Sequence, residues 1–227
     1  MFSQQASAAT RILPFAVYIL FLALDQPLSQ MMSAAGLDAR WLYGYRVGCV
    51  AMLLTWLWRQ YRELIWPFAV RMQGWLAALA VGTAVFALWI FPYPDWAVMG
   101  GAGRGFSPLH ADGKSIDPWL AAMRVAGAAL VVPLMEELFW RSFLMRWLDH
   151  QDFLNVDPAR ISLRALAVSS VLFAVEHSLW LAGLLAGLAY GWLYMRYRKL
   201  WVPVGAHAVT NGLLGLWVIQ TGSWTYW

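Results

Sequence analysis

Two adjacent glutamates interrupt an apolar stretch, VVPLMEELFWRSFLMRW (residues 131–147). Inside a membrane an ionisable side chain costs at least roughly 2.5–3.5 kcal/mol, which makes each one a candidate for function. Glu137 and Arg141 are four residues apart, so on a helix they share a face and are expected to pair. Glu136 is rotated from Glu137 by about 100° and is expected to face a cavity. Pro133 is expected to kink the helix just before them.

Two further polar clusters lie in apolar stretches, FAVEH and HAVTN. Phe173 precedes His177 by one helical turn, so its ring is expected to pack against the imidazole. His207 and Asn211 are also one turn apart, and together they can donate two hydrogen bonds to a single point.

The three clusters supply a carboxylate, two imidazoles and an amide. This set suits hydrolysis, in which a carboxylate aided by histidine deprotonates water and hydrogen-bond donors hold the tetrahedral oxyanion. Taken singly, each cluster also fits a structural role: an ion pair with a spare glutamate at the water interface, or polar contacts between helices. No serine or cysteine in a recognisable nucleophile motif competes with the glutamates.

The composition of the 227 residues indicates an integral membrane protein. Hydrophobic residues make up 61% and charged residues 12%, about half the charged fraction of a soluble domain. Sixteen tryptophans fit the headgroup layer, and the closing GSWTYW resembles an interfacial anchor. The net charge of +4 reflects topology and does not indicate nucleic-acid binding. A single cysteine, Cys49, excludes an internal disulfide and a cysteine-based metal cluster.

We therefore expect one all-α membrane domain over residues 1–227, a polytopic bundle of about seven transmembrane helices. The expected spans are 12–32, 42–58, 75–91, 119–140, 163–180, 181–195 and 200–219. Asp25 interrupts the first span, which also fits a signal peptide, although we favour an uncleaved helix. At about 1.5 Å per residue, His177 lies about 20 Å into its span and His207 only about 10 Å into its own, so span five must tilt or begin outside the hydrocarbon.

Charge and glycine patterns predict topology and packing. Every second connection carries basic residues, which places the N-terminus inside and the C-terminus outside. These residues are Arg59, Arg62, Arg71, Arg146, Arg160, Arg164, Arg196, Arg198 and Lys199. Gly183, Gly187 and Gly191 recur at one per turn and predict close helix packing within the chain, with a dimer seam as the alternative. The polar stretch 92–118 is interpreted as a connector, with a lid or a partner site as the alternatives.

The three clusters resemble the motif set of the CPBP family, also called the Abi or CAAX-protease family: EExxxR, FxxxH and HxxxN, in that order, over about residues 119–219. The resemblance implies an intramembrane glutamic endopeptidase that needs no metal or other cofactor. By motif position, Glu136 would activate water with help from His177, while His207 and Asn211 would form the oxyanion hole. Glu137 and Arg141 would brace the site.

The family resemblance also implies membrane-anchored protein substrates that are cleaved near their C-termini. Longer stretches, VVPLMEELFWRSFLMRWL and LWLAGLLAGLAYGWLY, resemble the branch found with bacterial exosortase sorting systems. That branch implies a bacterial inner-membrane location and exosortase-type partners.

Three other functions remain open on the residues alone. A zinc metalloprotease would use Glu136, His177 and His207 as ligands, although no HExxH motif is present. A transporter would use the buried glutamate and histidines as a proton relay. A non-catalytic scaffold would keep the motifs only for packing.

Overall fold

Helices form the regular structure of the chain, as the composition predicts. The computed structural model describes residues 2–64, 66, 69–99 and 105–227. In these ranges we find an isolated bridge between Leu109 and Ile116 but no strand. The α-helices are α1 (Phe2–Ala23), α2 (Asp25–Ala34), α3 (Leu42–Trp56), α4 (Met72–Trp89), α5 (Pro118–Ala126), α6 (Val132–Glu137), α7 (Met145–Trp147), α8 (Leu163–Val175), α9 (Trp180–Tyr197) and α10 (Trp201–Thr221).

One continuous helix, Pro118–Trp147, runs through the centre of the molecule and joins α5, α6 and α7. It begins at Asp117, whose side chain accepts hydrogen bonds from two backbone N–H groups, with proline at the first helical position. Two π-helical segments, Gly127–Val131 and Leu138–Leu144, lie on either side of α6. The helix extends past residue 140, where we expected it to end. The polar side chains beyond that residue form hydrogen bonds and ion pairs in the interior of the protein, which allows the helix to continue there.

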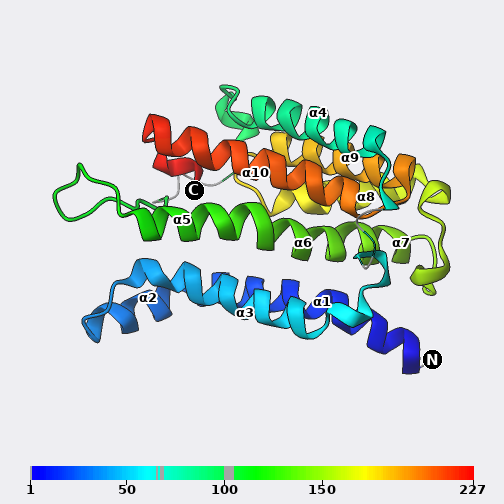
Figure 1. Cartoon of the computed structure of the whole chain (residues 1–227), viewed down its shortest axis with the longest axis horizontal. Coiled ribbons are helices and arrows are strands. Elements are labelled where there is room, and N and C mark those ends of the chain that lie inside the picture. The colour runs from blue at the N-terminus through cyan, green and yellow to red at the C-terminus, as the bar shows by residue number, and fades with distance from the viewer. Residues whose placement is uncertain (1, 65, 67–68, 100–104) are drawn as a thin grey trace.

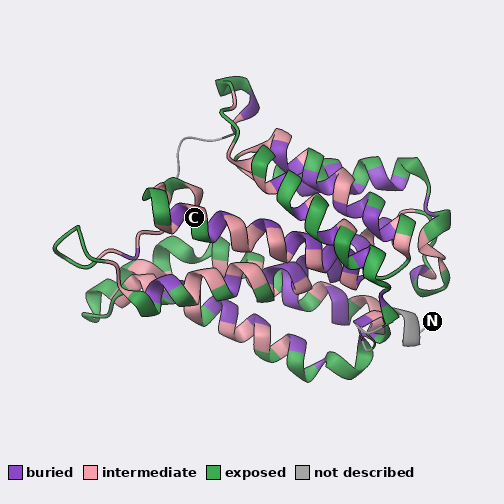
Figure 2. Ribbon diagram, turned by 45° about the horizontal axis from the view of Figure 1, so that its top comes forward, coloured by how far each residue is buried: buried purple, intermediate pink, exposed green. Residues whose placement is uncertain are grey.

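The other helices lie on two sides of this central helix. Helices α1 and α3 cover one side, and α4, α8, α9 and α10 form the other layer (Figure 1). Buried positions follow the inner faces of the helices, whereas exposed positions lie on the outer faces and in the connections (Figure 2). The outer faces carry large exposed apolar side chains such as Met52, Leu76 and Leu130, which suit contact with lipid.

Three helices of the described chain are long and apolar enough to cross a membrane: α4, the central helix and α10. The count rises to four if α1 and α2 form one broken span. The number of seven spans therefore remains a prediction. Several apolar helices nevertheless support an integral membrane protein.

The first expected span is not one straight helix. Helices α1 and α2 meet at an angle of 60° next to Asp25. Asp25 opens α2 in its first turn, and its carboxylate lies 3.8 Å from Arg46 on α3. The charge that interrupts the apolar pattern thus coincides with the bend.

Helices α8 and α9 form a short antiparallel hairpin. Helix α8 ends at Val175, before the expected limit at residue 180, so His177 lies in the turn between the two helices. A Cβ atom added to Gly187 would lie 3.0 Å from the Ser170 Cα, and one added to Gly183 would lie 3.2 Å from the Ala174 Cα. The glycines therefore serve packing within the chain, as predicted. His177 thus lies at the tip of this hairpin, beyond the end of α8.

Candidate active site

Glu137 is fully buried and forms the predicted pair with Arg141. The Arg141 Nε lies 3.1 Å from the Glu137 Oε2, and Arg141 Nη2 donates a hydrogen bond of 3.3 Å to the Gly187 carbonyl on α9. The guanidinium also lies 4.6 Å from the centre of the Phe173 ring on α8. Arg141 thereby connects the central helix to both arms of the hairpin, and Phe173 contributes to this support.

Glu136 is also buried, but its carboxylate is differently placed. It lines a cavity, and in the described structure its Oε2 has no hydrogen-bond partner. That oxygen lies 3.9 Å from the Nε2 of His207. The short α6 that carries both glutamates is flanked by π-helical turns, which occur often at functional sites. The two neighbouring carboxylates are therefore in different environments, as expected from their rotation around the helix.

His207 on α10 is held in place by Glu137. Its Nδ1 lies 3.1 Å from the Glu137 Oε1, which assigns a proton to Nδ1 and turns Nε2 toward Glu136. The Tyr190 ring stacks on the imidazole at 5.0 Å between ring centres. The Tyr190 hydroxyl donates to Thr210, whose own hydroxyl donates to the Gly82 carbonyl on α4. Three helices thus fix the orientation of one imidazole ring.

His177 presents its other nitrogen to the cavity. Its Nδ1 lies 2.8 Å from the Phe173 carbonyl and donates to it, which leaves the lone pair of Nε2 free to accept a proton. The rings of Phe173 and Trp89 pack against the imidazole at 4.7 Å and 5.2 Å. No ion pair within 4.0 Å joins His177 to Glu136 in the described chain; the histidine paired with Glu136 is His207.

Asn211 makes a contact that the sequence did not predict. Its side-chain Nδ2 donates a hydrogen bond of 2.8 Å to the Ala128 carbonyl. That carbonyl is free because the N–H of Val132 binds Gly127 in the π-helical segment and Pro133 has no N–H. The asparagine therefore stabilises the distorted turn before α6 and retains one amide hydrogen for another partner.

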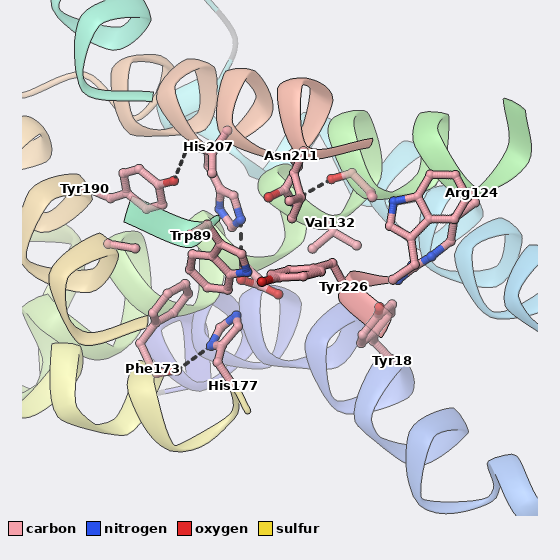
Figure 3. A pocket seen from close by; sticks show the side chains of 16 residues that line it. Tyr18, Trp89, Arg124, Val132, Phe173, His177, Tyr190, His207, Asn211 and Tyr226 are labelled. Carbon is pink, nitrogen blue, oxygen red and sulfur yellow. Dashed lines mark hydrogen bonds and ion pairs between the residues drawn. The ribbon is translucent and has the colours of Figure 1, made fainter. Parts of the chain in front are cut away.

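A cavity of about 230 Å³ connects these groups (Figure 3). Five expected residues line it: Glu136, Phe173, His177, His207 and Asn211. Glu137 and Arg141 lie outside the lining, as supports. The sequence analysis missed Tyr18, Trp89, Arg124, Tyr190, Thr210, Tyr226 and Trp227, which also line the cavity. Tyr226 and Trp227 belong to the segment that we interpreted as an interfacial anchor. Thr210 lies within HAVTN and Tyr190 within LWLAGLLAGLAYGWLY, but the sequence assigned neither of them a role.

The zinc alternative finds no support in the geometry. Among the described residues, no group of three or more His, Cys, Asp and Glu side chains could hold a metal ion.

Comparisons with known proteins agree with the resemblance at the level of the family. Residues 118–213 match the family model described as Type II CAAX prenyl endopeptidase Rce1-like, a protease family. The match covers less than half of the 227 residues and includes all three motifs. It supports a CAAX-type membrane protease. No curated protein and no solved structure matches the chain.

Proposed function

We propose that the protein is an intramembrane endopeptidase of the glutamic type, which hydrolyses peptide bonds in membrane-anchored proteins. The observation that carries the proposal is the unequal state of the two glutamates. The Oε2 atoms of both glutamates have no hydrogen bond among the described residues. That of Glu137 lies 3.1 Å from Arg141 Nε, and its Oε1 lies 3.1 Å from His207, whereas Glu136 lines a cavity that it shares with both histidines. A buried charge without a partner is expensive, and a water positioned for chemistry is a partner of the required kind.

In the proposed reaction, Glu136 takes a proton from a water molecule that also binds Nε2 of His177. The water oxygen attacks the peptide carbonyl, and the negative charge develops on the carbonyl oxygen. His207, when protonated at Nε2, and the second amide hydrogen of Asn211 donate to that oxyanion. The proton held by Glu136 then passes to the leaving nitrogen as the carbon–nitrogen bond breaks, which yields a carboxylic acid and an amine.

The cavity lies between the helices, and this position suits substrates that enter from the bilayer. Residues at one end of the helices form two basic pockets, the first with Arg59, Arg62 and Arg146 and the second with Arg71, Arg196 and Lys199. This distribution supports the proposed orientation, with that end and the N-terminus inside. The resemblance to the exosortase-associated branch motivates the further proposal of a bacterial inner-membrane protease that acts on sorted proteins.

The test compares the C-termini of membrane proteins by quantitative mass spectrometry. Host cells would carry wild type or Glu136→Gln at matched membrane levels. Uncleaved C-termini that accumulate in the variant would identify the substrates and support the proposal. Identical C-termini of the membrane proteins in both strains would refute the proposal and favour a non-catalytic scaffold. A loss of potential-driven transport instead would favour the proton relay.

A further inference from the structure

The first of the two basic pockets, with a volume of about 750 Å³, lies at the end of the molecule where α1 begins and the central helix ends (Figure 1). Among the described residues it shares no lining side chain with the cavity that holds Glu136. Four arginines and two carboxylates line it, an excess of two positive charges. These residues are Arg11, Arg59, Arg62, Arg146, Glu63 and Asp152.

Two of these arginines are buried and share one carboxylate. Arg11 donates to both oxygens of Glu63, at 2.8 Å and 2.7 Å, so that pair is complete. Arg146 donates to Ser142 instead, and its Nη2 lies 3.7 Å from the Glu63 Oε1. Because a buried charge is costly unless it is compensated, the partly compensated guanidinium of Arg146 favours a further anion in the pocket.

The other two arginines are exposed at the same pocket. Arg59 and Arg62 lie in successive 3₁₀ turns, and in the described chain neither forms an ion pair within 4.0 Å. The second carboxylate of the lining, Asp152, accepts a hydrogen bond of 2.7 Å from Asn155. Guanidinium groups without a carboxylate, next to a buried one, suit a phosphate, whose several oxygens accept charge-assisted hydrogen bonds.

Exposed tryptophans indicate that the first basic pocket lies at the depth of the lipid headgroups. Trp56 ends α3 and Trp58 directly precedes Arg59, while Trp147 ends the central helix; all three indole side chains are exposed. Indole rings concentrate at the membrane–water interface. Leu154, which lines the pocket and is also exposed, offers an apolar contact for an acyl chain. The phosphate that reaches this pocket from the bilayer is therefore that of a lipid.

We propose that the first basic pocket binds one anionic phospholipid, whose phosphate contacts Arg59, Arg62 and Arg146. The lipid joins the connection after α3 to the end of the central helix. A net negative lipid is favoured over a zwitterionic one by the excess of positive charge in the lining. A lipid is favoured over a soluble phosphate because only a lipid also uses the apolar contact at Leu154.

The second basic pocket provides a matched control. Its described cations, Arg71, Arg196, Arg198 and Lys199, are all exposed, so it does not have the buried guanidinium of the first. The test variant combines Arg59→Gln with Arg62→Gln, and the control variant combines Arg71→Gln with Arg196→Gln. Each removes two exposed positive charges from the same end of the molecule. Both variants should therefore unfold at the temperature of wild type in phosphatidylcholine.

The test titrates the full chain in detergent with phosphatidylglycerol or phosphatidylcholine and counts the bound lipids by native mass spectrometry. We expect wild type to bind one phosphatidylglycerol at least about 10-fold more tightly than phosphatidylcholine, the order of a hydrogen bond to a charged group. The test variant should bind phosphatidylglycerol about 30-fold more weakly than wild type, as expected for two basic residues beside an anionic lipid. The control variant should stay within about threefold of wild type.

Three outcomes would overturn the proposal. An equal loss of affinity in the two variants would show only a general attraction between charges. Equal affinity of wild type for the two lipids would remove the preference for an anionic headgroup. That equality, combined with stabilisation by inorganic phosphate that depends on Arg59 and Arg62, would assign the pocket to a soluble anion. Because no measurement requires cleavage, these results are independent of the proposed role of Glu136.

Discussion

Two clusters of buried charge lie next to each other on the central helix, and they differ in how completely their polar atoms are paired. The open cluster consists of Glu136, Glu137, Arg141 and His207. The closed cluster consists of Arg11, Glu63, Ser142 and Arg146 and joins α1, the connection after α3 and the end of the central helix.

In the closed cluster, the charged and polar side chains form hydrogen bonds directly with one another. Arg11 donates to both oxygens of Glu63, at 2.8 Å and 2.7 Å, and Ser142 donates to the same carboxylate. Arg146 donates to the backbone and side chain of Ser142. The open cluster, by contrast, leaves Glu136 Oε2, Glu137 Oε2 and Arg141 Nη1 without hydrogen-bond partners among the described residues. A cluster of buried charges is therefore not by itself a sign of an active site. The distinguishing feature is an unpaired polar atom beside a cavity.

The largest expected effect is on activity at Glu136. Glu136→Gln removes the proposed base and should lower the cleavage rate by a factor on the order of 10²–10⁴, with little change in the free energy of unfolding. The rate would be measured on a substrate identified by the comparison of C-termini. A rate within twofold of wild type would remove Glu136 from the mechanism.

Glu137→Gln should damage both fold and function. It leaves Arg141 buried without its carboxylate, which is expected to lower the free energy of unfolding by about 3–5 kcal/mol. It also frees His207 from its orienting partner, so cleavage should fall as well. Unfolding would be followed in nanodiscs, with Glu137→Gln combined with Arg141→Met as the control that removes the stranded charge. An undiminished stability of the single variant would show that Arg141 does not depend on this pair.

Glu63→Gln should show the opposite pattern from Glu136→Gln. The closed cluster contributes to stability, so its loss should lower the free energy of unfolding by about 1–3 kcal/mol. The cleavage rate per folded molecule should stay within about twofold, because Glu63 is absent from the cavity lining. The folded fraction would be measured by limited proteolysis alongside the rate. A rate loss as large as that of Glu136→Gln would erase the distinction between the clusters.

The closed cluster also predicts a dependence of stability on pH. Burial raises the pKa of Glu63, but hydrogen bonds and charge from Arg11, with Ser142, outweigh it and hold the pKa below its usual range. Such a group stabilises the fold above the ordinary carboxylate pKa of about 4.3, and this contribution is lost as pH falls through the lower, folded pKa. Unfolding measured from about pH 6 down to about pH 3 should show a steeper loss in wild type than in Glu63→Gln. An equal loss of stability with falling pH in wild type and Glu63→Gln would count against a lowered pKa of Glu63.

The smallest effect is expected at the hairpin that positions His177. Gly187→Ala places a Cβ 3.0 Å from the Ser170 backbone, so overpacking of about 1–3 kcal/mol should exceed the gain of up to about 1 kcal/mol in helix propensity. Gly48→Ala on α3 meets nothing within 4 Å and is the matched control, which should be neutral or stabilising. Thermal unfolding of both variants checks this. A stabilised Gly187→Ala would mean that α8 and α9 separate easily.

The local part of the site could be predicted from the sequence because helical spacing determines it. The pairing of Glu137 with Arg141 and the contact of Phe173 with His177 both follow from a separation of four residues. The closed cluster could not be predicted, because residues 11, 63 and 142 meet only in the folded chain. Arg124 was missed for a related reason, since nothing in its neighbouring sequence shows that it lines the cavity.

The fold was predicted in class but not in detail. Apolar stretches indicated helices, but the turn that places His177 at the tip of a hairpin depends on tertiary packing. The π-helical turns could not be predicted either, because the sequence analysis assumed 3.6 residues per turn in every helix. They explain why Asn211 binds the Ala128 carbonyl, a contact that spacing along α10 does not reveal.

The most direct measurement compares Glu136→Gln with Glu63→Gln in the same host and quantifies membrane-protein C-termini per folded molecule of enzyme. The account predicts uncleaved substrates with Glu136→Gln and normal processing, per folded molecule, with Glu63→Gln. If both variants process substrates normally, or if both fail alike, the open cluster around Glu136 is not a catalytic site distinct from the closed one.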